Sequence, residues 1–82
     1  MAKHIGVIGV VLDQPQQASN SINAIISENH EIVVGRMGIP RCQASVGVLA
    51  LIVEGEEAAL NAMVEKLKKV PGVTVSATSS PM

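Results

Sequence analysis

The chain contains no phenylalanine, tyrosine or tryptophan among its 82 residues, and its only cysteine is Cys42. A single cysteine cannot form a disulfide within the chain, and we expect a protein of the reducing cytoplasm. The sequence also lacks a signal-peptide pattern and the stretch of about 20 apolar residues that a membrane span requires. Its formal net charge of −1 offers no basic surface to a nucleic acid backbone, so we expect direct binding neither to nucleic acid nor to a membrane.

Apolar residues make up 48% of the chain and charged residues 16%, which is the composition of a folded globular protein. We expect residues 1–78 to form a single domain and residues 79–82 to form a flexible C-terminal tail. A domain of this size hides only about 60–65% of the surface that its unfolded chain would expose, and oligomerisation is a common way to hide more.

Four segments have the composition of β-strands. Ile5–Leu12 is β-branched and interrupted by glycines, while residues 73–78 alternate apolar with hydroxyl-bearing side chains. Glu31–Ile39 is a further strand, which Pro40 ends because proline cannot donate to a ladder. A hairpin then leads to the longest strand, expected over Cys42–Val53.

Two segments are amphipathic helices. The first follows Asp13, whose carboxylate we expect to cap the helix N-terminus, and it ends near Asn29. The second follows Gly55, begins with glutamates and ends with lysines, an order that complements the helix dipole. The order of elements is therefore β-α-β-β-α-β, typical of the ferredoxin-like α+β fold with a four-stranded antiparallel sheet and two helices on one face. Right-handed crossovers place the first and third strands in the centre of the sheet.

Val46–Val53 is apolar on both of its alternating faces, so each side of this strand needs a cover. Two helices cover only one face of a sheet. We therefore expect a homo-oligomer, a dimer or a tetramer, in which another copy covers the second face.

Arg36 and Arg41 flank the hairpin and could grip a carboxylate or phosphate through their guanidinium groups. Gly38 leaves backbone amides of the hairpin accessible. We expect a small anionic effector near Arg36, Gly38 and Arg41 at a subunit interface, with the turn at Asp13 as the competing location. The alternative is that the arginines only protect an edge strand.

His4, His30 and Cys42 are the only soft metal ligands in the chain, and no two of them have the short spacing that would place them on one face of an element. We expect no intrinsic metal site and no cofactor, although a site shared between subunits stays open. The inward positions of the strands are Val, Ile, Leu, Ala and Gly, so we expect no catalytic residues.

Residues 32–40 and 67–75, together with the apolar third strand, resemble the iron-only hydrogenase system regulator family of small stand-alone proteins. The resemblance covers residues 3–77. It implies an ACT-like, ferredoxin-fold regulatory module of the bacterial cytoplasm. ACT domains that bind amino acids use the turn between the first strand and the first helix, which corresponds here to Leu12–Gln16 and includes Asp13 and Gln14. Nickel-responsive relatives use closely spaced histidines and a ribbon-helix-helix segment, and this chain has neither.

The leading hypothesis is a non-enzymatic ACT-like module that binds a small effector and acts in trans on a partner protein. One alternative is a small dimeric ferredoxin-like enzyme that works without a cofactor. Another is a purely structural self-assembly module, which the two-faced strand also fits.

Overall fold

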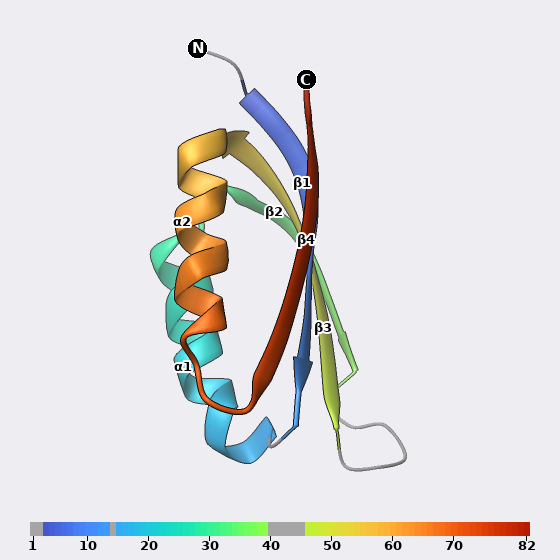
Figure 1. Cartoon of the computed structure of the whole chain (residues 1–82), viewed down its shortest axis with the longest axis vertical. Helices are drawn as coiled ribbons and strands as arrows, with labels where there is room; N and C mark the ends of the chain where they lie inside the picture. Colours follow the sequence, from blue (N-terminus) through green and yellow to red (C-terminus); the bar gives the residue numbers. More distant parts are fainter. Residues whose placement is uncertain (1–2, 14, 40–45) are drawn as a thin grey trace.

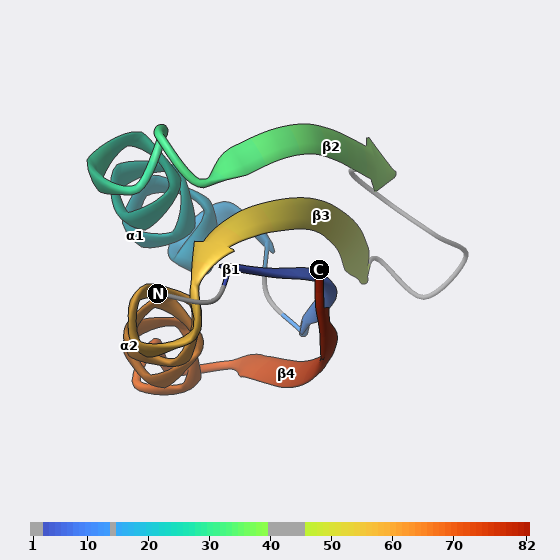
Figure 2. The ribbon, with the colours of Figure 1, turned by 90° about the horizontal axis from the view of Figure 1, so that it is seen from above.

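The computed structural model describes residues 3–13, 15–39 and 46–82. Along the chain the elements are β1 (Lys3–Leu12), α1 (Pro15–Glu28), β2 (Val33–Ile39), β3 (Gly47–Glu56), α2 (Glu57–Lys68) and β4 (Val73–Pro81). The four strands form one antiparallel sheet in the order β2-β3-β1-β4, which confirms the predicted fold and the central position of the first and third strands. Both helices lie on the same side of the sheet (Figures 1 and 2).

The core lies between the helices and the inward face of the sheet. Alternate residues of the two central strands point into it, because successive side chains of a strand face opposite sides. The helices contribute residues at spacings of three and four, as an amphipathic stripe requires. The most completely buried side chains are Ile8, Val10, Ile22, Leu51, Val53, Met63 and Leu67.

The outward face of the sheet is apolar and has no helix over it (Figure 1). Val7 pairs with Ile52 in the register, and Val11 pairs with Val48. All four side chains point outward, and each keeps 38–41% of its surface exposed. Leu51, on the inward face of β3, has no exposed surface. Together with the outward Val48 and Ile52, it shows that β3 carries apolar side chains on both faces, as its sequence predicts.

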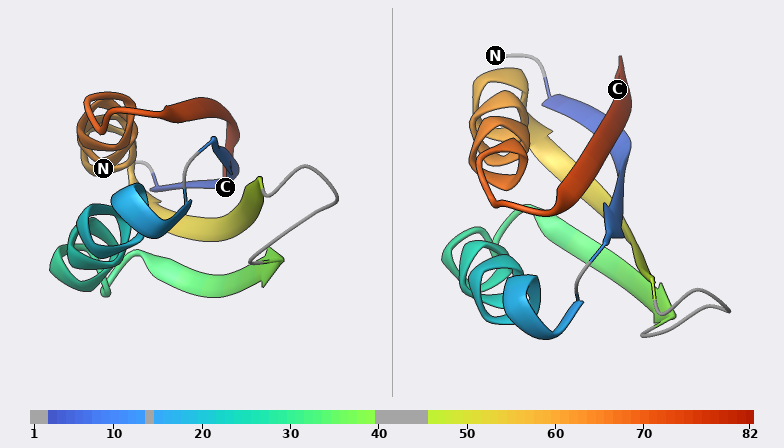
Figure 3. Two further views of the ribbon diagram at one scale, coloured as in Figure 1. Left: turned by 90° about the horizontal axis from the view of Figure 1, so that it is seen from below. Right: turned by 60° about the horizontal axis from the view of Figure 1, so that its bottom comes forward.

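The predicted flexible tail over residues 79–82 is wrong for most of its length. β4 continues to Pro81 beside β1, with Ser79 opposite Gly6 and Pro81 opposite His4 (Figure 3, right). Beyond the strand, the Met82 amide donates to the Lys3 carbonyl at 2.9 Å. The serines resembled a loop by composition, but their small side chains and backbone groups complete the ladder with β1. The folded unit therefore extends through the last residue of the sequence.

Two further boundaries differ from expectation. β3 runs on to Glu56, and the predicted start of this strand at Cys42 lies outside the described residues. α1 begins at Pro15, one residue later than a cap at Asp13 requires, because proline favours the first helical position. Gln14, between Asp13 and the helix, lies outside the described residues.

Gly72 forms the turn from α2 into β4 and has φ of +79°, a left-handed conformation that glycine adopts without steric cost. None of the helices in the described part of the chain is long and apolar enough to cross a membrane.

Candidate functional site

Arg36 lies on the edge strand β2, in register with the inward-facing Leu51, and its side chain is exposed. Its guanidinium Nη2 donates to Oδ1 of Asn23 on α1 at 3.3 Å. A hydrogen bond between exposed groups is weak, so a carboxylate or phosphate could replace the amide oxygen at little cost. The structure thus adds Asn23 to the predicted effector site. No sequence pattern indicated it, because the two residues meet only when α1 packs beside β2.

Gly38 occupies the same edge, opposite Leu49. A Cβ built at Gly38 would lie 3.2 Å from the Leu49 Cδ1 atom, so a larger residue here would press on the core. Arg41, the second arginine of the predicted site, lies outside the described residues. The pairing of two guanidinium groups at this hairpin therefore stays a prediction.

Asp13, the competing location, follows the last residue of β1 and is exposed. Its backbone amide donates to the Gly72 carbonyl at 2.8 Å, which ties the turn before α1 to the turn before β4. In the register, Gly38 pairs with Leu49 and Leu49 pairs with Val10, which is close to Asp13 along β1. Arg36 pairs with Leu51, which pairs with Ile8 in the middle of β1, so Arg36 lies further from Asp13 than Gly38 does. Neighbouring strands are about 4.8 Å apart and residues rise by about 3.3 Å along a strand, so two strand spacings and three residues separate Gly38 from Asp13 by roughly 14 Å. The two candidate locations are therefore distinct.

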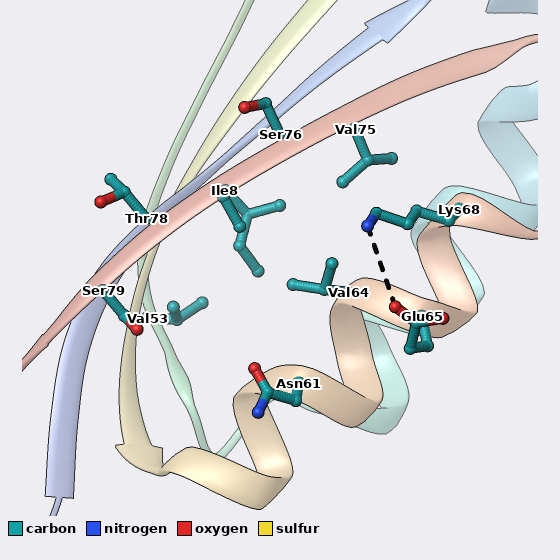
Figure 4. Close-up of a pocket in the computed structure, with 11 residues that line it drawn as sticks. Ile8, Val53, Asn61, Val64, Glu65, Lys68, Val75, Ser76, Thr78 and Ser79 are labelled. Atoms are coloured by element: carbon teal, nitrogen blue, oxygen red, sulfur yellow. Dashed lines mark ion pairs between the residues drawn. The ribbon is translucent and has the colours of Figure 1, made fainter.

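A groove, which no sequence pattern predicted, runs between α2 and β4 (Figure 4). One flank of α2 faces α1, where the Lys66 Nζ atom lies 3.7 Å from Glu28 Oε1. The opposite flank carries Asn61, Glu65 and Lys68 and borders the groove. The Lys68 Nζ and Glu65 Oε2 atoms form an ion pair at 3.8 Å on its rim. The sequence shows that Asn61, Glu65 and Lys68 share one side of the helix, since they are four and three residues apart. It does not show that this side borders β4, because that depends on how α2 packs on the sheet.

The groove has a volume of about 410 Å³ and an apolar floor. On the β4 side the groove is open, because the inward residues there, Ala77 and Ser79, have small side chains. The floor is formed by Ile8, Val53, Val64 and Val75. A second hollow of about 290 Å³ lies on the outward face of the sheet, beside Ile5, Val7 and Ile52.

The described residues contain no group of three His, Cys, Asp or Glu side chains that could hold a metal ion. His4 lies at the start of β1 with its Nδ1 atom buried and without a hydrogen-bond partner. His30 follows α1, with Nδ1 3.1 Å from the Ser27 carbonyl oxygen. Cys42 lies outside the described residues, so the absence of a metal site stays a prediction.

Comparisons with known proteins agree with the fold. A family model described as "TM1266-like: Iron-only hydrogenase system regulator, putative" matches residues 4–77. No curated protein matches the chain. Among solved structures, the uncharacterized protein TM1266 from Thermotoga maritima superposes with a TM-score of 0.84 at 20% identity, over 98% of each chain.

Two further solved structures superpose well. The ACT domain of GTP pyrophosphokinase from Chlorobium tepidum gives a TM-score of 0.75 at 21% identity, over 90% of this chain and 96% of that one. The C-terminal domain of MgtC from Mycobacterium tuberculosis gives 0.74 at 19% identity, over 94% and 87%. At these identities the superpositions show a common fold.

Proposed function

Since the chain belongs to the TM1266-like iron-only hydrogenase system regulator family and has an ACT-like fold, we propose that it is a non-enzymatic regulatory module of the cytoplasm. It works as an oligomer, binds a small effector and acts in trans on a partner protein. The observation that carries this proposal is the bare apolar face of the sheet, which a working module of this kind must cover.

A second copy is the proposed cover of this face. The outward side chains of the two central strands are mostly Val and Ile, with Gly9 opposite Ala50 near the middle. A surface of such β-branched and small residues packs well against the same surface of a second sheet. Burying a Val or Ile side chain fully contributes about 1.5–3 kcal/mol relative to exposure, and these side chains are already partly covered. The exposed large apolar residues of the face are Ile5, Val7, Val11, Met37, Val48 and Ile52.

Paired substitutions on the two faces of β3 test the assembly. Val48→Asp with Ile52→Asp places charges on the outward face, and we expect a folded protein of smaller mass by sedimentation velocity. Leu49→Asp with Leu51→Asp places charges in the core, and we expect loss of the folded far-UV circular dichroism spectrum. A wild-type chain that sediments as a monomer at micromolar concentration would refute the oligomer.

The effector is proposed to be a small anion held near Arg36, Gly38 and Arg41 at a subunit interface, with the turn at Asp13 and Gln14 as the competing location. A charge-assisted contact to arginine contributes about 1.5–3 kcal/mol, which corresponds to one to two orders of magnitude in affinity. The support for this location is that the Arg36 guanidinium is exposed and donates to the exposed side-chain amide of Asn23, which an anion can replace.

Calorimetric titration with amino acids, nucleotides and organic acids tests the site. Arg36→Ala and Arg41→Ala should each weaken a ligand found in this way by about 10-fold or more. Lys3→Ala is the matched control, because Lys3 is an exposed cation of β1 opposite Glu56, at the other end of the sheet. Equal affinity in both arginine variants and the wild type would exclude this location.

A purely structural self-assembly module is the second candidate, because the same bare face favours it. It predicts that no small anion changes the oligomer size, whereas a sensing module changes its size or thermal stability when its effector binds.

A further inference from the structure

The two edges of the sheet are protected very differently. β2 carries Arg36 and a register shift between Val33 and Gly35, both of which discourage another strand from pairing. β4 spans Val73–Pro81 without any charged side chain and without a register shift along its pairing with β1. A nine-residue uncharged edge is the kind of surface that pairs with another strand.

The backbone groups on the free side of β4 can be identified from the two ends of its ladder. The Met82 amide donates to Lys3, and the Asp13 amide donates to the Gly72 carbonyl, so the even-numbered residues of this segment bond to β1. In an antiparallel pair, amides alternate between the two sides of the strand. The odd-numbered residues of β4 therefore present their amides and carbonyls to the free edge, and Pro81, which has no amide, falls on that side.

The sequence of β4 is complementary to itself in the antiparallel direction. Ala77 is its central residue, so a two-fold axis there pairs every residue of the strand with one of the second copy. Ser76 then lies opposite Thr78 on the outward face, where hydroxyl pairs across strands are favourable. On the inward face two small Ala77 side chains meet, and Val75 lies opposite Ser79.

The α2–β4 groove supports this pairing. The groove is open at Ala77 and Ser79, over the apolar floor that includes Ile8 and Val53. In the self-paired arrangement the Val75 side chain of the second copy lies opposite Ser79. It thus brings an apolar group to the part of the edge where the inward residues of this chain, Ala77 and Ser79, are small. The added strand thus offers backbone partners to the edge and an apolar group to the groove.

We propose that β4 pairs with β4 of a second copy, antiparallel about a two-fold axis at Ala77, so that the two sheets become continuous. This interface is separate from the outward face invoked above, because it uses backbone groups and inward residues of β4. A chain that uses both surfaces forms a two-layered assembly larger than a dimer.

Disulfide trapping tests the axis. In a Cys42→Ser background, Ala77→Cys places two thiols on the axis, where paired Cα atoms lie about 5.5 Å apart, within the range that a disulfide bridges. We expect nearly complete conversion to a covalent dimer under mild oxidation. Ser79→Cys is the control, because two such residues are offset by about 13 Å along the strands and should stay reduced.

Amide hydrogen exchange of the uncrosslinked wild type supplies an independent readout. The amides of Ser76 and Thr78 bond to β1 and should be protected whether or not the edge is paired. The amides of Val75, Ala77 and Ser79 should be equally protected only if a second strand covers the edge. Free-peptide exchange at these odd positions, or equal crosslinking of the two cysteine variants, would overturn the proposal.

These outcomes are distinguishable from failure of the proposed regulatory oligomer. The Val48→Asp, Ile52→Asp variant prevents packing through the outward face. With Ala77→Cys and Cys42→Ser added, this variant should still form the covalent dimer. If crosslinking fails while the wild type sediments as an oligomer, edge pairing is wrong and packing through the outward face stands. An extended segment of another protein is then the remaining candidate for the edge.

Discussion

Replacing Gly6 by alanine should detach the C-terminal half of β4 from the sheet. Gly6 lies on β1 opposite Ser79 and its position is buried. An added Cβ would overlap the Thr78 carbonyl oxygen and would lie 2.8 Å from the Ser79 Cβ atom. Backbone atoms cannot move aside by a change of rotamer, so the strand itself must shift.

The cost can be estimated by comparison with Gly9, which lies three residues further along the same strand. A Cβ at Gly9 would have its nearest contact with the Ser76 carbonyl oxygen at 3.7 Å, an ordinary van der Waals distance. Both substitutions reduce the entropy of the unfolded chain, which stabilises the fold by about 0.4–1 kcal/mol in each case. Only Gly6→Ala adds overpacking, which typically costs about 1–3 kcal/mol. The difference in unfolding free energy between the two variants is therefore about 1–3 kcal/mol.

Thermal unfolding followed by far-UV circular dichroism measures this difference, since the chain has no aromatic residue for fluorescence. For a domain of this size, 1 kcal/mol corresponds to about 4–8 °C in Tm, so Gly6→Ala should melt roughly 4–24 °C below Gly9→Ala at the same protein concentration. Hydrogen exchange should show faster exchange of the Ser80 amide in Gly6→Ala alone. If Gly6→Ala melts at or above Gly9→Ala, the close approach of β4 is not a property of the protein.

Gly72→Ala should lower the unfolding free energy by about 1–2 kcal/mol because the φ of residue 72 is positive, and Gly72→Asn should lower it less. Chemical denaturation measures both changes. Equal stability of the wild type and the two variants would contradict the turn geometry. Lys66→Ala should change stability by less than about 0.5 kcal/mol, because its ion pair with Glu28 is exposed; a loss above 1 kcal/mol would show that the contact between the helices depends on it. Cys42→Ser and His4→Ala should leave the metal content of dialysed protein unchanged and near zero by elemental analysis; stoichiometric nickel, iron or zinc that is lost in either variant would reveal a shared site.

Most of the fold could be predicted from short-range patterns. Alternation in the strands, helical spacing and Pro40 located the elements to within a few residues, and the two-faced strand Val46–Val53 indicated a central position. The last strand was cut short because Ser79–Pro81 has the composition of a tail. These residues can pair with β1 because Gly6 has no side chain to block them. A local pattern around residues 79–81 cannot show this, because Gly6 is far away in the sequence.

The candidate site was predicted less completely. Arg36 and Gly38 were identified from residue type, and both lie on the edge strand as expected. The contact of Arg36 with Asn23 and the groove between α2 and β4 could not be found in this way, because each joins elements that are far apart in sequence. Arg41 and Gln14 lie outside the described residues, so their part in the site stays a prediction.

The sequence by itself determined the order of the elements and the face that each strand and helix buries, because hydrophobic periodicity is a local property of the chain. It also determined that β4 carries no charge and that β2 carries Arg36. Only the tertiary structure decided which amides of β4 face solvent, where its small residues leave a groove, and how far it extends along β1. These features depend on the register between strands, and that register is fixed when the whole sheet packs against its helices.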